Sequence, residues 1–364
     1  MKRINNLVLI ALLLVMTLTG CNTPKDPAQI YEEERSGVVL IFNNYYYEIK
    51  MPNGESLYFT GLDKEDGIIG LTADLNEVKK KPGVLNGTGF FIDETGKILT
   101  NRHVVAPEID KIAVKENLNQ IIGGYAAYIE SLQEEMNKKY AAIREYAANS
   151  VYSDDYGNQY TSLDDSEISA LEEEVNTLKS QYAEAEEYKQ NLQSNLLGDH
   201  FSVQLHSTFG IAYDGSSVTS FADFQKNPCI LVKASKDEGT DLALLQLKSK
   251  KTPEDKFIFI LNDSYGDEGN QLLVNDPLYM IGYNHGIQLA NTNKGVRAQF
   301  TSGTVTQEPD GDRVLYSMPS MQGSSGSPVV NAYGDVVAVN FAGTVGSDNF
   351  NFGIPYRRIQ LFLK

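Results

Sequence analysis

The sequence changes its periodicity in the middle, and this change constrains the fold more than any other feature. Between about residues 117 and 197 the apolar side chains follow a helical period. In the second half of this stretch they step by threes and fours, with Lys189 as the one interruption: Ile168, Leu171, Val175, Leu178, Tyr182, Ala185, Leu192 and Leu196. This heptad spacing predicts a coiled coil. Because a turn-rich segment, 149–158, divides the stretch, we expect an antiparallel helical hairpin.

The segments on both sides of this hairpin consist of short β-prone runs separated by turn residues. One pair of runs, 45–51 and 55–59, is joined by Pro52-Asn53-Gly54, and Asn-Gly between such runs is a strong hairpin signal. Similar runs recur after residue 198 up to Phe341. The expected fold class is therefore all-β, a sandwich or barrel interrupted by the α-helical insertion.

Composition excludes several classes of protein. The chain has 364 residues, 48 acidic against 31 basic side chains and a formal net charge of −17. Such an acidic chain is a poor candidate for general binding to nucleic acid, which depends on cationic neutralisation of phosphates. Two Cys and four His exclude a disulfide scaffold and a His/Cys-rich metal protein. No metal site and no cofactor are expected.

The N-terminus has the pattern of a secretion signal. Lys2 and Arg3 precede an apolar run over 7–18, which is too short to span a bilayer comfortably. The following Leu-Thr-Gly-Cys, ending at Cys21, resembles the bacterial lipobox, in which the cysteine is acylated. We expect a signal peptide over 1–20, a tether over 21–35 and a lipid-anchored protein of the bacterial cell envelope. The alternative is a buried N-terminal helix.

Three short motifs together indicate a nucleophilic site. His103 follows a strand-like run, Asp241 precedes one in Gly-Thr-Asp-Leu-Ala-Leu-Leu, and Ser325 lies within Gln-Gly-Ser-Ser-Gly-Ser-Pro. Each motif alone has an ordinary structural explanation. A serine nucleophile, however, needs a base within hydrogen-bond reach, and the base needs a carboxylate that fixes its tautomer. The chain order His, Asp, Ser is that of the chymotrypsin type.

With these motifs the chain resembles a trypsin-like serine protease of the chymotrypsin fold, most similar to the bacterial HtrA/Deg branch. The resemblance covers roughly 36–115 and 200–360. It implies two six-stranded antiparallel β-barrels with the site in the cleft between them. The expected domains are a first barrel part over 36–116, the hairpin over 117–197 and the rest of the protease over 198–364.

The resemblance also implies a role for each site residue. Ser325 would be the nucleophile, His103 the general base and then acid, and Asp241 the orienting carboxylate. The backbone N–H groups of Gly323 and Ser325 would form the oxyanion hole. A primary substrate pocket would be formed by the following residues: Pro319, Asn340, Phe341 and Ala342. Since no acidic residue stands at its base, a small or medium apolar side chain is expected there.

The chain departs from the HtrA pattern at three points. Ser324 replaces the usual Asn before the nucleophile and is expected to contribute mainly its backbone. Ser327 replaces a Gly and adds a side chain that could narrow the site. Because the sequence ends at Lys364, the PDZ modules typical of that branch are expected to be missing.

The expected function is thus a membrane-tethered, extracytoplasmic serine endopeptidase that acts on proteins or peptides. Its expected contacts are the membrane, through lipid on Cys21, and self-association or partner binding through the hairpin over 117–197. The alternative is a proteolytically inactive or latent lipoprotein that acts as a binding or scaffold module. In a latent form the hairpin would gate the cleft, because it is inserted between His103 and Asp241.

Overall fold

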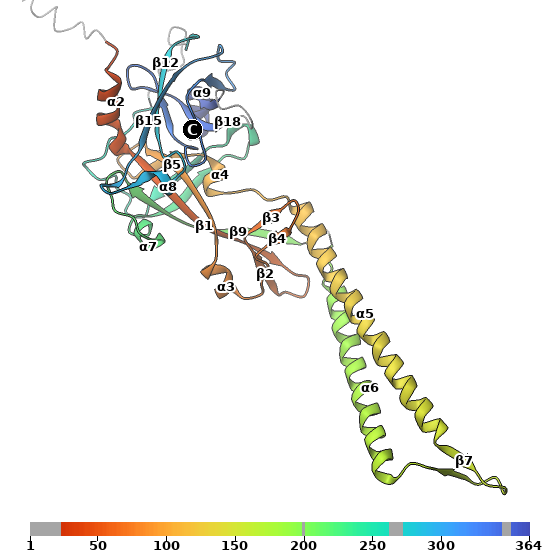
Figure 1. The fold of residues 1–364 in the computed structure, drawn as a ribbon. Coiled ribbons are helices and arrows are strands. Elements are labelled where there is room, and N and C mark those ends of the chain that lie inside the picture. The colour runs from red at the N-terminus through yellow and green to blue at the C-terminus, as the bar shows by residue number, and fades with distance from the viewer. Residues whose placement is uncertain (1–22, 199–200, 262–271, 344–350) are drawn as a thin grey trace, which may run out of the picture. The chain divides into compact units, whose positions relative to one another are not determined.

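The computed structural model describes residues 23–198, 201–261, 272–343 and 351–364. The chain divides into two compact units, and each is described by itself (Figure 1). The first unit comprises Met1–Tyr45, Val84–Glu108 and Ser207–Lys364, and the second comprises Tyr46–Gly83 and Ile109–His206. The predicted signal peptide and Cys21 lie outside the described residues.

The first sheet closes on itself. Its strand order is β2-β1-β5-β6-β11-β10-β9, and an additional pairing joins β1 to β9, so that six of the seven strands form a ring. The strands are β1 (Val38–Lys50), β2 (Ser56–Phe59), β5 (Gly83–Phe91), β6 (Lys97–Thr100), β9 (Ser202–Tyr213), β10 (Pro228–Ala234) and β11 (Ala243–Leu247). Both β1 and β9 continue into the second unit, where β1 pairs with β2.

The second sheet lies wholly within the first unit and has six antiparallel strands in the order β15-β12-β17-β18-β19-β16. They are β12 (Pro277–Gly282), β15 (Gln299–Thr304), β16 (Val314–Tyr316), β17 (Pro328–Val330), β18 (Val336–Gly343) and β19 (Asn351–Pro355). An isolated bridge between Val305 and Tyr316 connects the two outer strands. The motif with the predicted nucleophile, Ser325, directly precedes β17 of this sheet.

Alternation along β1 shows why the first unit can bury its strands on both faces. Val38 and Leu40 belong to one buried apolar cluster, whereas Val39 and Ile41 belong to another. Successive side chains of a strand point to opposite faces, so one apolar run serves two cores. The second of these clusters also contains Val104, which follows the predicted catalytic histidine.

Short helices and one small hairpin complete the first unit. They are α2 (Pro27–Glu34), the 3₁₀ turn η1 (Arg35–Gly37), α4 (Arg102–Val105), α7 (Phe221–Phe224), the 3₁₀ turn η2 (Glu238–Thr240), α8 (Ile287–Ala290), β13 (Asn291–Thr292), β14 (Gly295–Val296) and α9 (Tyr356–Leu363). The C-terminal helix α9 buries Ile359 and Phe362, and both belong to the larger apolar cluster.

The second unit contains the predicted helical hairpin. Figure 1 shows α5 (Lys111–Asn149) and α6 (Asp165–Ser194) running side by side, connected by β7 (Val151–Ser153) and β8 (Gln159–Thr161). Helix α5 begins six residues before the predicted boundary at 117, because the Asp110 side chain accepts hydrogen bonds from the first-turn N–H groups of Ile112 and Ala113. The helical insertion is confirmed.

Residues 46–83, which were expected in the first barrel, belong to the same unit as the hairpin. They contain β2, β3 (Gly61–Asp63), β4 (Gly67–Ile69) and α3 (Leu75–Lys80). The Asn117 side chain of α5 accepts a hydrogen bond from Ile68 N–H at 3.1 Å. A Cβ at Gly67 would lie 2.4 Å from that side chain, and Gly67 has φ +74°. Glycine therefore allows the β3–β4 turn to approach α5 closely.

Lys189, the residue that interrupts the apolar heptads, takes part in a polar contact across the hairpin. Its Nζ lies 3.0 Å from a Glu186 carboxylate oxygen and 3.6 Å from Glu130 on α5. The Gln133 side chain is buried and donates to Glu186 at 3.0 Å. These hydrogen bonds lower the pKa of Glu186 to about 2. Lys189 thus interrupts the apolar row because it belongs to a cluster of polar side chains between the two helices, which satisfy one another by hydrogen bonds.

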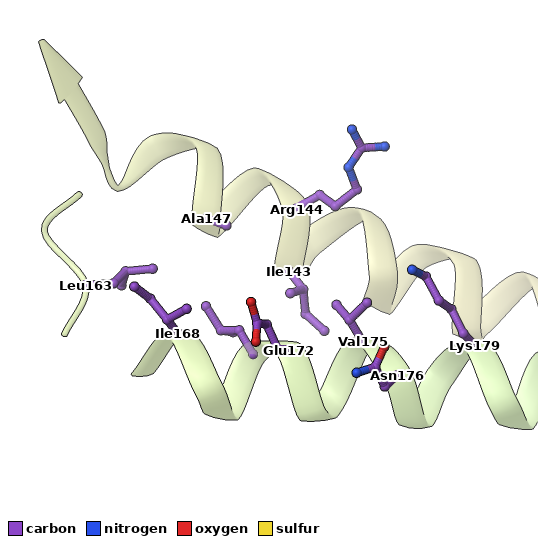
Figure 2. Close-up of a pocket in the computed structure, with 10 residues that line it drawn as sticks. Ile143, Arg144, Ala147, Leu163, Ile168, Glu172, Val175, Asn176 and Lys179 are labelled. Atoms are coloured by element: carbon purple, nitrogen blue, oxygen red, sulfur yellow. The ribbon is translucent and has the colours of Figure 1, made fainter. Parts of the chain in front are cut away.

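An apolar groove lies between the two helices toward their β7–β8 end (Figure 2). Its volume is about 480 Å³. Its lining comes from both helices and the segment that joins them: Ile143, Arg144, Ala147, Leu163, Ile168, Leu171, Glu172, Val175, Asn176 and Lys179. The predicted heptad residues of α6 thus face α5 but leave space between the helices at this end.

The expected all-β class is wrong for the chain as a whole. Two sheets dominate the first unit, as predicted, but α5 and α6 alone span Lys111–Asn149 and Asp165–Ser194. Further short helices, among them α2 and α9, belong to the first unit. Among the described residues no helix is long and apolar enough to cross a membrane.

Candidate active site

Strand pairing brings His103 and Asp241 together. Strands β6 and β11 pair antiparallel with Thr100 opposite Ala243, so the residues just after β6 meet those just before β11. The backbone N–H of Arg102 and the Asn101 side chain both donate to the Asp241 carbonyl, at 3.1 and 2.9 Å. The histidine therefore lies in a short helix, α4, whose start is fixed on the aspartate's own backbone.

The Asp241 carboxylate is directed at the histidine. One oxygen lies 2.5 Å from His103 Nδ1, and the other accepts the His103 backbone N–H at 2.9 Å. Asp241 is only 5% exposed, so this charge is removed from water and compensated by these two hydrogen bonds. A carboxylate at Nδ1 holds the proton there and leaves Nε2 free to act as a base.

Phe341 of β18 connects the histidine to Ser325. The Ser325 hydroxyl donates to the Phe341 carbonyl at 3.4 Å. The Phe341 ring meets the His103 ring edge to face, with 6.4 Å between ring centres. In the described part of the chain Ser325 has no hydrogen bond to His103, whose side chain is 46% exposed. The structure thus brings the three predicted residues around one strand residue.

The turn around Ser325 leaves two backbone donors unused. Ser324, Gly326 and Ser327 donate their N–H groups to backbone carbonyls. Within the described residues no hydrogen bond has the N–H of Gly323 or Ser325 as its donor. These are the two groups predicted for the oxyanion hole, and free convergent N–H groups are what such a hole requires.

Gly323 is required by the shape of this turn. Its φ is +98°, and a Cβ would lie 2.4 Å from both Gly286 N and the Tyr283 carbonyl. Its own carbonyl accepts a hydrogen bond from Thr88 Oγ1 at 2.8 Å, while the Thr88 N–H donates to the Ser325 carbonyl, also at 2.8 Å. Thr88 therefore holds the carbonyl groups of the same two residues, Gly323 and Ser325, whose N–H groups would be the oxyanion donors.

The side chain of Ser324 has more contacts than expected. Its hydroxyl donates to the Met321 carbonyl at 2.6 Å and accepts from the Met321 N–H at 3.1 Å. The buried Asn340 amide donates to the Ser324 carbonyl at 3.0 Å. Ser327 is fully buried and its hydroxyl donates to that same carbonyl at 2.6 Å. The hydroxyl groups of both serines thus stabilise the turn by hydrogen bonds within it, and Ser327 does not project into the site.

The predicted pocket residues fall into different environments. Asn340 is fully buried and accepts a hydrogen bond from the Tyr316 hydroxyl at 2.6 Å, and burial raises the pKa of Tyr316. Pro319 is exposed, so it does not form a buried floor beneath Asn340. Ala342 lies in β18 opposite Phe352. Phe341 is a predicted pocket residue with described contacts to the candidate catalytic residues His103 and Ser325.

Sequence reasoning missed Thr88 and Arg358. A lone threonine such as Thr88 carries no signal for a bond to a turn 235 residues away. Arg358 of α9 donates to the Gly239 carbonyl at 2.9 Å and to Thr240 Oγ1 at 3.1 Å, in the turn before Asp241. Nothing in the sequence connects the two segments.

Comparisons with known proteins bear on the class of the enzyme. The family described as "Trypsin-like peptidase domain" matches residues 214–339, which include Asp241 and Ser325. This match confirms a trypsin-like peptidase domain and supports the predicted enzyme class, a trypsin-like serine endopeptidase. No curated protein matches the chain.

Among solved structures, the chain is similar to the serine endoprotease from Yersinia pestis, with 12% identity and a TM-score of 0.42. The match covers 94% of this chain and 66% of the other, so the chain spans just under two thirds of that protein's length.

Within the described residues no group of three or more His, Cys, Asp or Glu side chains gathers in a metal-binding arrangement.

Proposed function

We propose that this chain is a serine endopeptidase of the HtrA-like, trypsin-like type, tethered to the outside of a bacterial membrane. Its substrates would be proteins or peptides. The observation that carries the proposal is the Asp241 carboxylate 2.5 Å from His103 Nδ1, with Phe341 in contact with both His103 and the Ser325 hydroxyl. The two-barrel arrangement of trypsin-like peptidases is part of the same proposal.

In the proposed mechanism His103 Nε2 removes the Ser325 hydroxyl proton while Oγ bonds to the scissile carbonyl carbon. The negative oxygen of the tetrahedral intermediate accepts the N–H groups of Gly323 and Ser325. His103 then returns the proton to the leaving amine as the C–N bond breaks, which leaves an acyl ester on Ser325. A water molecule then attacks the ester carbonyl while His103 takes its proton. The ester bond breaks, His103 returns the proton to Ser325 Oγ, and the carboxylic acid product is released. Asp241 stays ionised and stabilises the imidazolium.

A fluorophosphonate probe tests the nucleophile. We expect the probe to label the wild-type protein, and Ser325→Ala and His103→Ala to abolish labelling, because the phosphorus is attacked only by an activated hydroxyl. The matched control is Ser249→Ala, since Ser249 is an exposed serine outside the site. Absence of labelling in the folded wild-type protein would refute the active enzyme and favour the alternative, an inactive or latent scaffold.

The membrane tether is proposed from the N-terminal sequence, which ends in the lipobox-like Leu18-Thr19-Gly20-Cys21. An acylated cysteine would become the N-terminus and hold the chain at the membrane surface. We expect Cys21→Ala to shift the protein from the membrane fraction to the soluble extracytoplasmic fraction. An unchanged distribution would contradict the lipid anchor.

We also propose that the hairpin, as a coiled coil, joins two copies of this chain. A twofold contact needs a surface complementary to itself. The apolar groove between α5 and α6 fits this requirement, because its apolar lining is flanked by side chains of both charges, Arg144, Lys179 and Glu172 (Figure 2). Sedimentation should show a dimer that Arg144→Glu weakens and the added Glu172→Arg restores. Glu173→Arg, at an exposed residue outside the groove, is the control. A monomeric wild-type protein would contradict the proposal.

A further inference from the structure

A small cavity lies next to the candidate catalytic residues. Its volume is about 270 Å³, and it is lined by strand and loop residues of the first unit: Gly239, Asp312, Arg313, Phe341, Phe352, Gly353, Ile354 and Arg358. Phe341 places it beside the site, because this residue contacts both the Ser325 hydroxyl and the His103 ring. The cavity therefore borders the residue that contacts both candidate catalytic side chains.

The aromatic part of the lining comes from neighbouring strands. The rings of Phe341 on β18 and Phe352 on β19 have their centres 5.3 Å apart. Both side chains are half-buried, so they offer an apolar surface to a ligand. Such a surface excludes water from one side of the cavity, and a charge pair formed against it is screened less than one in open solvent.

The charged groups of the lining are not balanced. Arg358 forms an ion pair with Asp312, and its remaining contacts are with the Gly239 carbonyl, Thr240 Oγ1 and Asp237. One guanidinium is thus shared between the carboxylates of Asp312 and Asp237. The guanidinium of Arg313 lies over the Phe352 ring, 5.4 Å from its centre. Within the described residues it has no ion pair and no side-chain hydrogen bond.

Arg313 is held in place by its backbone. The Asp310 carboxylate accepts the backbone N–H groups of Asp312 and Arg313, both at 2.9 Å. These bonds, with a smaller contribution from the positive charge of Arg313, lower the pKa of Asp310. Asp310 is therefore used by its own turn. A guanidinium that lies over an aromatic ring makes no hydrogen bond with it, so its N–H donors stay available, and these match the two oxygens of a carboxylate.

We propose that this cavity is a substrate subsite that takes an acidic side chain, Asp or Glu, close to the scissile bond, and that Arg313 selects it. The inference rests on the proposed endopeptidase function and deepens it. The chain as a whole has a net charge of −17 and would repel an acidic peptide at long range. A local positive charge at the site is thus the means by which such a substrate would be accepted.

The test is cleavage of a proteome-derived peptide library, followed by kinetics on a peptide pair that differs only by Glu or Gln. Wild type should favour Asp or Glu at one position near the cleaved bond. Arg313→Gln should lower kcat/KM for the Glu peptide by about tenfold and leave the Gln peptide unchanged, since a charged hydrogen bond is lost. Arg313→Lys should retain part of the preference, and Arg313→Glu should reverse it. The control is Arg357→Gln, an exposed arginine that does not line this cavity.

The outcomes separate this inference from the proposed function. If wild type cleaves the library and reacts with the fluorophosphonate probe but shows no acidic preference, or if Arg313→Gln keeps that preference, the subsite assignment is wrong and the endopeptidase stands. If the folded wild type neither cleaves nor reacts, both proposals fail together.

Discussion

At the scale of single residues, the aspartate has the least freedom of the three candidate catalytic side chains. Asp241 is 5% exposed, and both carboxylate oxygens accept hydrogen bonds from the same histidine, one from Nδ1 and one from the backbone. The carboxylate therefore fixes both the ring and the backbone of His103. A buried carboxylate held like this is more than a strand cap, the ordinary explanation that its sequence context also allowed.

Asp241→Asn separates the two functions of this carboxylate. The amide keeps the shape and can still accept the His103 backbone N–H, but its NH₂ group cannot accept the proton on Nδ1. We expect kcat to fall by a factor on the order of 10³–10⁴ because the wrong tautomer is favoured. Peptide hydrolysis and urea unfolding would be measured together. A variant with near-wild-type kcat would exclude Asp241 from the mechanism.

At the scale of elements, how far the sequence could predict the site depends on the distance between contacting segments. The His, Asp and Ser motifs are local phrases whose chain order is informative, and the β6–β11 pairing then brings His103 to Asp241. The hydrogen bonds that hold the turn around Ser325 could not be predicted from the sequence. They join Thr88 of β5 and Asn340 of β18 to the turn, and these strands meet it only in the folded chain.

The helices show the same limit. Heptad spacing predicted the hairpin, yet it could not show that Lys189 would be paired with Glu186 beside a buried Gln133. Nor could it show that residues 46–83 belong to the hairpin's unit. One contact within that unit is the hydrogen bond from Ile68 N–H, in the β3–β4 hairpin, to the Asn117 side chain of α5. Periodicity identifies an element, whereas its partners follow from single polar contacts.

Helix α9 is predicted to act on the site through η2. Arg358 bonds to Gly239 and Thr240, directly before Asp241, so we infer that it is a positioning residue. For a peptide without acidic side chains, Arg358→Lys should lower kcat by on the order of tenfold and leave KM unchanged, since a small displacement of a catalytic group is costly. Arg357→Lys is the exposed neighbour control. If Arg358→Lys lowered thermal stability, and activity fell only in proportion to the fraction of protein that is unfolded, the positioning role would be contradicted.

At the scale of the whole molecule, one carboxyl links the N-terminal segment to the second sheet. Glu34 ends α2 and is fully buried, and among the described residues neither of its carboxyl oxygens has a hydrogen-bond partner. It packs against Gly334 in the turn between β17 and β18, where a Cβ would lie 2.3 Å from Oε1. Lys25, nearby, forms its ion pair with Glu33 instead.

Burial is the main cause that raises the pKa of Glu34 from 4.5 to about 8, and Lys25 opposes it. Below pH 4.5 the carboxyl is protonated in both the folded and the unfolded chain, so it imposes no penalty. As the pH rises toward 8, the unfolded chain releases this proton while the folded chain keeps it, and unfolding becomes easier. By linkage the stability lost over this window is of the order of a few kcal/mol.

Glu34→Gln should therefore flatten the dependence of stability on pH. Near pH 4.5 the variant and wild type should unfold at similar urea concentrations, and near pH 8 the variant should be the more stable of the two. Glu33→Gln is the matched control, because hydrogen bonds from Lys25 and Gln29 lower the pKa of Glu33 and its contribution has the opposite sign. If wild type and Glu34→Gln lose stability in parallel between pH 5 and 8, Glu34 is not protonated in the folded chain. The carboxylate would then have to be compensated in its buried position by a group that moves toward it, and Lys25 is the nearest cation that could do so.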